Sequence, residues 1–144
     1  MKFYNIVTSS KQFEINEIIM NMSNTEVDCI QSLYNSISIV EYTNELGNEC
    51  MFSILDDYHL NKLSEFLEKY SLNFKVFDLT NDVIFDYNFK TNFKNEFGRT
   101  IEDDILNLIK KFKKNFISKD DILDKILEKG IDSLTDFDLD ILNS

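Results

Sequence analysis

The segment from residue 36 to residue 55 predicts a β-hairpin, which limits the folds that can form around it. Its first residues alternate serine with isoleucine, at Ser36, Ile37, Ser38 and Ile39. The sequence NELGN at 44–48 supplies a turn. Residues 49–55 then return with apolar side chains on one face, namely Cys50, Phe52 and Ile54. Two antiparallel strands are therefore expected in the first half of the chain.

A strand and a helix are also predicted on each side of this hairpin. Residues 2–8 are apolar and β-rich, and Ser9 with Gln12 has the pattern of a capping box that begins a helix. The apolar face of that helix comprises Phe13, Ile15, Ile18, Ile19 and Met22. After the hairpin, Asp56 is placed to cap a second helix, and residues 73–79 follow as a strand. The second helix carries an apolar stripe of Leu60, Leu63, Phe66, Leu67 and Tyr70.

This order predicts an α+β fold of the ferredoxin-like β-α-β-β-α-β type over residues 1–80. In that arrangement four strands form an antiparallel sheet, and both helices cover one of its faces. Residues 24–35 fit two structures. A helix would align Val27, Ile30 and Tyr34, whereas a strand would align Val27, Cys29 and Leu33. The fold hosts many unrelated functions, so it does not select one of them.

The last third of the chain is predicted to be helical. Three hydroxyl residues, each followed three positions later by aspartate, indicate helix starts at Thr100, Ser118 and Thr135. Gly130 is placed to end the second of these helices. The first helix carries an apolar stripe of Ile101, Ile105, Leu108, Ile109, Phe112 and Phe116. Residues 99–144 are therefore expected to form a helical appendage that packs on the same core.

Residues Asp120–Leu142 within this appendage read DDILDKILEKGIDSLTDFDLDIL. Their core is Ile122-Leu123-Asp124-Lys125-Ile126, followed by Lys129-Gly130 and Ser133-Leu134-Thr135. The stretch resembles a short tail that follows rhomboid-type membrane proteases in some bacteria, and it covers about a sixth of the chain. The resemblance implies two short helices. It does not carry over the protease chemistry, because no membrane helix is expected in this sequence.

The charge of the chain favours a basic partner. The chain has 26 acidic and 15 basic residues, a formal net charge of −11. Nucleic-acid affinity depends largely on Lys and Arg neutralising phosphates, so direct nucleic-acid binding is not expected. Anionic membranes are disfavoured for the same reason. Residues 1–72 hold 11 acids against 4 lysines, so a basic protein partner should bind there first. A homodimer is left open.

The cysteines and the N-terminus favour a cytoplasmic location. Cys29 and Cys50 do not form a CxxC pair, which is typical of a reduced, intracellular chain. The sequence MKFYNIVTSS has an apolar stretch too short for a signal peptide.

The supply of reactive residues argues against an enzyme, a cofactor site or a metal site. His59 is the sole histidine; Asp56 could orient it as a general base, but it also fits a polar residue in the first turn of a helix. The three glycines are scattered and form no phosphate-binding motif, at Gly47, Gly98 and Gly130. The alternation of Asp136, Asp138 and Asp140 lacks the glycine and glutamate of a calcium loop. No catalytic, cofactor-binding or metal-binding residue is therefore predicted.

Residues 81–98 form an aromatic connecting segment between the two predicted parts. Within residues 83–97, phenylalanines recur every four residues, as on a helix, while apolar residues also alternate, as on a strand. A short strand followed by a loop is favoured. These rings either pack the appendage on the sheet or form a contact surface, since aromatic side chains often dominate binding energy. Together with the acids of the hairpin they make up the predicted partner-binding set, Glu41, Glu45, Glu49, Phe85, Tyr87, Phe89 and Phe93.

We predict from these features a non-catalytic protein-binding or inhibitor protein, of the immunity or anti-defence type, that recognises a basic partner through an acidic surface. A first alternative is a small-molecule-sensing regulatory domain of ferredoxin-like fold. A second alternative is an enzyme with a carboxylate site of unfamiliar kind, because acids cluster around the hairpin. A stoichiometric partner would favour the first function, and a thermal shift with one class of metabolite would favour sensing.

Overall fold

The computed structural model describes residues 1–85 and 101–144. The chain divides into two compact units, Met1–Leu108 and Ile109–Ser144. The first unit contains a β-sheet with helices, and the described residues of the second are helices and their connections. None of the helices in the described ranges is long and apolar enough to cross a membrane.

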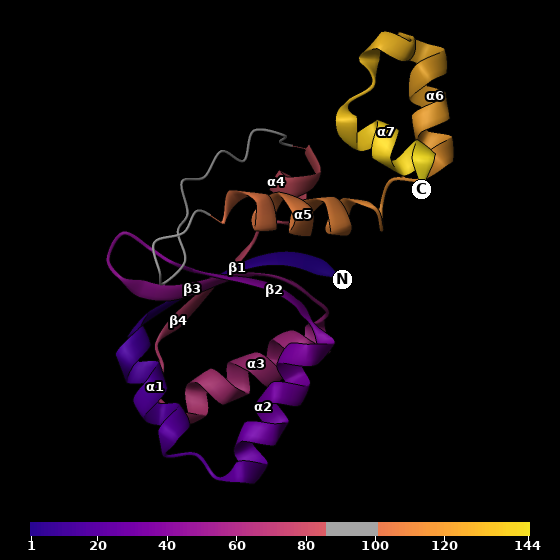
Figure 1. Ribbon diagram of the computed structural model, residues 1–144. Coiled ribbons are helices and arrows are strands. Elements are labelled where there is room, and N and C mark those ends of the chain that lie inside the picture. The colour runs from indigo at the N-terminus through magenta and orange to yellow at the C-terminus, as the bar shows by residue number, and fades with distance from the viewer. Residues whose placement is uncertain (86–100) are drawn as a thin grey trace. The chain divides into compact units, whose positions relative to one another are not determined.

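The described part of the first unit contains a four-stranded antiparallel sheet (Figure 1). Its strands are β1 (Lys2–Lys11), β2 (Ser38–Thr43), β3 (Asn48–Leu55) and β4 (Phe74–Asp78). They lie in the order β2-β3-β1-β4, so the first strand of the chain is internal. Ile6 of β1 pairs with Met51 on one side and with Val76 on the other. The predicted α+β class is confirmed.

The predicted hairpin is confirmed as β2 and β3, in which Tyr42 pairs with Cys50. The side chain of Asn44 fixes the turn by accepting hydrogen bonds from the backbone N–H groups of Leu46 at 3.0 Å and Asn48 at 2.9 Å. Gly47 has φ +78°, a conformation that glycine adopts without steric cost. The turn therefore sets the register of the two strands, which decides where the acids of the hairpin lie.

Three helices lie on one face of this sheet in Figure 1, namely α1 (Gln12–Met20), α2 (Asn24–Ser36) and α3 (Asp57–Lys69). The segment whose structure the sequence left open is helix α2. Ser23 and Glu26 form a capping box at its start, because Glu26 N–H donates to Ser23 Oγ and Ser23 N–H donates to Glu26 Oε2. The predicted cap of α3 is confirmed, since Asp56 Oδ1 accepts from the backbone N–H of His59 at 2.8 Å.

The predicted cap of the first helix is wrong. Ser9 does not cap a helix but continues β1, and its backbone N–H donates to the carbonyl oxygen of Asn73 at 2.9 Å. The cap of the helix is Lys11, two residues after the predicted one, and Lys11 N–H donates to Glu14 Oε2 at 2.6 Å. Ser9, which the local pattern assigned to the start of a helix, therefore belongs to a strand, because pairing with a neighbouring chain segment outweighs the local preference.

The sheet buries side chains on both faces. On the helix-covered face the buried cluster comprises Tyr4, Ile6, Met51, Leu55, Leu63, Leu67 and Leu72. Strand alternation places Phe3, Phe52 and Ile54 on the opposite face, where all three are buried. Figure 1 shows α4 (Thr80–Phe85) and the start of α5 (Glu102–Lys113) on that side. The backbone of Phe3 fixes the start of α4, donating to Thr80 Oγ1 and accepting from Leu79 N–H.

The second unit contains α6 (Lys119–Lys129), a 3-10 turn η1 (Ile131–Ser133) and α7 (Asp136–Asn143). Its core consists of Ile122, Phe137 and Ile141. The caps predicted at Ser118 and Thr135 are confirmed, and Gly130 ends α6 with φ +82°. The cap predicted at Thr100 lies outside the described residues. The resemblance to a rhomboid-associated tail stays a prediction.

Candidate functional site

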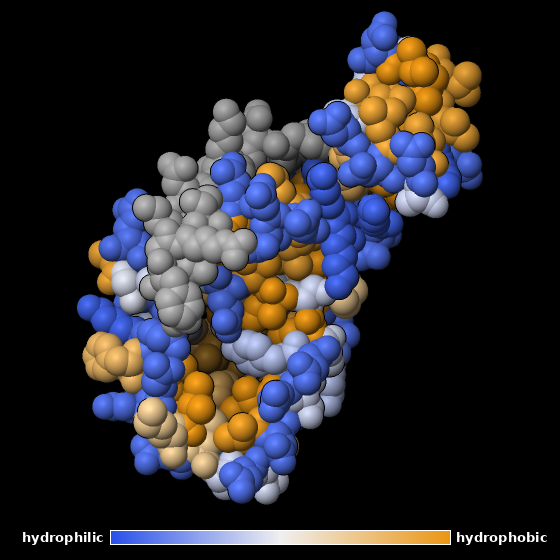
Figure 2. All heavy atoms as spheres, viewed as in Figure 1, coloured by the Kyte–Doolittle hydropathy of each residue, from blue (hydrophilic) through white to orange (hydrophobic). Residues whose placement is uncertain are grey.

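A cavity of about 470 Å³ lies between α1, α2, α3 and the sheet of the first unit. Figure 2 shows hydrophobic side chains gathered around the hollow between α1 and α2. The apolar part of the lining comprises Ile15, Ile18, Ile19, Met22, Val27, Ile30, Met51, Phe66, Leu67 and Leu72. Ligand pockets in proteins combine such an apolar lining, at volumes of about 300–1,000 Å³, with a few polar groups that orient the ligand.

The cavity exists because α1 and α2 do not pack closely on the sheet. Neither helix contains a buried residue, whereas α3 buries Leu63 and Leu67. On α1, Ile15 and Ile18 are only half-buried. Well-packed interiors leave few voids larger than a water molecule, so a space of this size between apolar walls is unusual for a core. Ile18 of α1 and Leu33 of α2 pack against the buried cluster, and other residues of the two helices form walls of the cavity.

Two carboxylates of the hairpin line the same cavity. In the register of β2 and β3, Glu41 pairs with Met51 and Glu49 pairs with Thr43. Side chains alternate along a strand, so Glu41, Glu49 and Met51 project from the same face of the sheet. Both glutamates are among the residues that line the cavity. The hairpin therefore brings two acidic groups, eight positions apart in sequence, to the rim of an apolar space.

Tyr34 of α2 lies beside these carboxylates. Burial raises the pKa of the Tyr34 hydroxyl above its ordinary value, and the negative charges of Glu41 and Glu49 raise it further. A tyrosine whose ionisation is suppressed in this way stays neutral and remains a hydrogen-bond donor.

Glu49 is positioned by its neighbours. Thr43 Oγ1 donates to Glu49 Oε1 at 3.3 Å, and the buried hydroxyl of Thr8 donates to the Glu49 carbonyl oxygen at 2.7 Å. In the orientation of the Gln12 amide that gives both its ends a partner, the nitrogen lies 3.1 Å and 3.2 Å from the carboxylate oxygens of Glu49. These contacts fix the carboxylate at the cavity wall. The described residues that line the cavity include no lysine or arginine.

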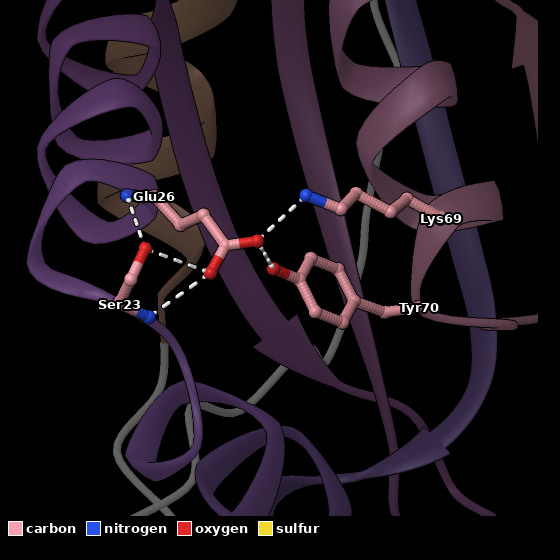
Figure 3. A network of polar contacts seen from close by, with 4 residues as sticks. All are labelled: Ser23, Glu26, Lys69 and Tyr70. Carbon is pink, nitrogen blue, oxygen red and sulfur yellow. Dashed lines mark hydrogen bonds and ion pairs between the residues drawn. The ribbon is translucent and has the colours of Figure 1, made fainter.

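The wall formed by α2 is tied to α3 by a polar network around Glu26 (Figure 3). One carboxylate oxygen of Glu26 accepts from Lys69 Nζ at 2.6 Å and from the Tyr70 hydroxyl at 2.8 Å. The other accepts from the backbone and the hydroxyl of Ser23. The ion pair with Lys69, followed by the Ser23 backbone hydrogen bond, lowers the pKa of Glu26 to about 2.

We expect this network to make the stability of the first unit pH-dependent. A carboxyl whose pKa is lowered on folding stabilises the fold above its unfolded value and loses that contribution as the pH falls through its folded value. The Glu26 contribution should therefore be complete above about pH 5 and decline toward pH 2. Glu26→Gln should lower the free energy of unfolding at pH 6, measured by urea denaturation, and the difference from wild type should shrink at pH 3. Asp28→Asn, an exposed change on the same helix, is the control, and an equal effect of both changes would contradict the network's role.

The structure places the predicted partner-binding residues in different environments. Glu41 and Glu49 meet at the cavity, whereas Glu45 is exposed in the hairpin turn and is not part of its lining. Phe85 is the last residue of α4, on the opposite side of the sheet (Figure 1). Tyr87, Phe89 and Phe93 lie outside the described residues. Tyr34 was not predicted as a site residue, because the open assignment of 24–35 gave no face on which to place it.

The other candidate sites are occupied by structural contacts. His59 Nδ1 lies 2.7 Å from Asp56 Oδ1, the geometry of a carboxylate-oriented imidazole. Asp56 also caps α3, and within the described residues His59 makes no hydrogen bond to a hydroxyl or a thiol. Asp138 belongs to the cap of α7 and pairs with Lys125 at 2.6 Å. Within residues 1–85 and 101–144 there is no group of three or more histidine, cysteine or acidic side chains that could hold a metal ion.

Comparison with protein-family models, curated proteins and solved structures gives no match to this chain.

Proposed function

We propose that this chain is a non-catalytic binding protein, of the inhibitor, immunity or anti-defence type, that recognises a basic protein partner through the acidic hairpin, defined as Glu41, Glu45 and Glu49. The observation that carries the proposal is the distribution of charge between the two units. Residues 1–108 hold 18 acids and 8 bases, a net charge of −10, whereas residues 109–144 are close to neutral. Complementary charge accelerates encounter with a basic partner and suppresses binding of acidic ones.

Charge reversal tests this proposal. The variant Glu41→Lys, Glu45→Lys, Glu49→Lys should lose the partner that the wild-type chain captures from its native lysate. The control Asp120→Lys, Asp124→Lys, Glu128→Lys changes the net charge equally on exposed residues of α6, and it should retain the partner. Affinity capture with mass spectrometry is the measurement, and circular dichroism checks that both variants fold. If both variants retain the partner equally, recognition by the acidic hairpin is contradicted. If both lose it equally, the overall charge of the chain determines binding, and the position of the acids does not.

A small-molecule-sensing regulatory domain is the second candidate function. The cavity between α1, α2, α3 and the sheet favours it, since apolar walls with a few convergent polar groups are typical of ligand pockets. A ligand held there would contact residues of three helices and three strands at once. Its binding would stabilise the folded first unit by mass action, which is a detectable signal.

We also propose that the sheet is of the ferredoxin-like type. The strand order β2-β3-β1-β4, with every neighbouring pair antiparallel, supports this assignment. Helical connections between β1 and β2 and between β3 and β4 support it as well. The first connection contains two helices, α1 and α2, where the simple pattern has one. That additional helix forms one wall of the cavity.

A further inference from the structure

We infer that the cavity of the first unit binds an uncharged small molecule, with an apolar body between α1, α2 and the sheet and one oxygen that accepts a hydrogen bond from the Tyr34 hydroxyl. This inference rests on the second candidate function, ligand sensing, and goes beyond it by naming the chemical class of the ligand. Glu41 and Glu49 have no role in it, and no protein partner is required.

Aliphatic side chains of the cavity walls specify an apolar body. Ile15 and Ile18 line the cavity from α1, Val27 and Ile30 from α2, and Met51 from β3. An apolar ligand that enters removes its own surface and that of these side chains from water, which is favourable. The volume of about 470 Å³ matches a drug-sized molecule. A charged group that enters between such walls loses its hydration, so the walls favour a ligand without charge.

Most of the enclosed polar groups in the described lining already have hydrogen-bond partners. Thr8 Oγ1 donates to the backbone carbonyl oxygen of Glu49, and the Cys50 thiol donates to a backbone carbonyl oxygen. The Glu49 carboxylate accepts from the Thr43 hydroxyl, and the Gln12 amide lies against the same carboxylate. None of these groups depends on a ligand for a hydrogen bond.

The Tyr34 hydroxyl is the exception among the enclosed groups. Tyr34 lines the cavity and is half-buried, and its hydroxyl makes no hydrogen bond to any residue that the structure describes. Burial is the main cause that raises its pKa, so the hydroxyl keeps its proton and can donate it to an acceptor. An enclosed donor without an acceptor carries the cost of its lost hydration. A carbonyl or ether oxygen of a ligand would offset that cost without bringing a charge into the cavity.

Three ligands with similar alkyl bodies test the class on the wild-type chain. Methyl octyl ketone is neutral and carries an acceptor oxygen, whereas decylamine is cationic and decanoate is anionic at pH 7. Each is titrated below its solubility or micelle limit, with the melting temperature and the heat of binding as readouts. The ketone should raise the melting temperature by several degrees at saturation, and both ions should bind more weakly. Tighter binding of either ion would overturn the inference.

The variant Tyr34→Phe tests the hydrogen bond, because it removes the hydroxyl and keeps the ring. Affinity for the ketone should fall by about three- to tenfold, while the melting temperature of the chain without ligand stays the same or rises. Tyr42→Phe is the matched control, because the Tyr42 hydroxyl donates to Asn5 Oδ1 at 2.9 Å and Tyr42 is not part of the described lining. This control should lower the melting temperature and keep the ketone affinity. Equal ketone affinity in the wild-type chain and in Tyr34→Phe would overturn the inference.

The variant Val27→Phe tests the location of the ligand without changing the hydrogen bond. The larger side chain narrows the cavity and should weaken the ketone, and an unchanged affinity would show that the ligand binds elsewhere and overturn the inference. If none of the three ligands binds to the wild-type chain, ligand sensing at this cavity fails together with the inference. If an ion binds most tightly and Val27→Phe weakens it, ligand sensing stands and only the class of ligand is wrong.

Discussion

Phe52→Ala should lower the free energy of unfolding of the first unit by about 3–5 kcal/mol, the usual cost of removing a buried phenylalanine ring. Phe52 is completely buried at the centre of β3. Its ring stacks on Tyr42 with centroids 5.0 Å apart and lies 6.0 Å from the ring of Phe3. The alanine variant would leave a cavity between these rings. It would also remove an aromatic interaction that exceeds simple area burial.

Urea denaturation followed by circular dichroism measures this effect. A domain of this size is usually stable by about 5–15 kcal/mol, so the variant should unfold at a much lower urea concentration. Phe13→Ala is the matched control, because its ring is 61 % exposed on α1 and its removal should change stability by less than about 0.5 kcal/mol. Similar losses for both variants would show that the aromatic stack on this face of the sheet is not where the stability of the first unit lies.

Asp138→Ala should unfold α7 in the second unit. Asp138 is buried, and one of its carboxylate oxygens accepts from Lys125 Nζ at 2.6 Å, from Thr135 N–H at 2.7 Å and from Thr135 Oγ1 at 2.8 Å. Hydrogen bonds that involve a charged group contribute about 1.5–3 kcal/mol, and loss of a helix cap costs about 0.5–2 kcal/mol. A unit of 36 residues has little stability in reserve, so this loss should be enough to melt the helix.

Hydrogen exchange of the amides of residues 136–143 measures the loss. Asp136→Ala removes an exposed carboxylate from the same first turn and should leave the exchange pattern nearly unchanged. Burial acts to raise the pKa of Asp138, but the hydrogen bonds from Lys125 and Thr135 outweigh it and lower the pKa. The contribution is therefore present above the ordinary aspartate value and declines as the pH falls below it. Protection of α7 that is equal in both variants would contradict the role of this carboxylate.

Local signals in the sequence were sufficient for the elements that carry strong periodicity or a side-chain cap. The hairpin, the cap at Asp56, the caps at Ser118 and Thr135 and the glycine that ends α6 were predicted from a few neighbouring residues each. The prediction of a cap at Ser9 was wrong because the Ser9 backbone N–H donates a hydrogen bond to Asn73, which lies 64 positions away. Long-range pairing of this kind leaves no trace in a short window.

The candidate site was only partly predictable for the same reason. Glu41 and Glu49 were selected for their charge, and strand register then placed both on the helix-covered face. Nothing in the sequence predicted that α1 and α2 would pack loosely enough to leave a cavity, because that depends on how far two helices stand from a sheet. The sequence of α2 also lacks a strong periodicity, so Tyr34 could not be assigned to a face.

The loose packing of α1 and α2 separates stability from specificity in the first unit. The fully buried side chains belong to the strands, to α3 and to the elements on the opposite face, so substitutions on the inner faces of α1 and α2 remove little buried surface. Such substitutions would reshape the cavity while the sheet keeps its fold. The same scaffold could therefore evolve toward new ligands through changes in two helices, with the risk of unfolding confined to other parts of the chain.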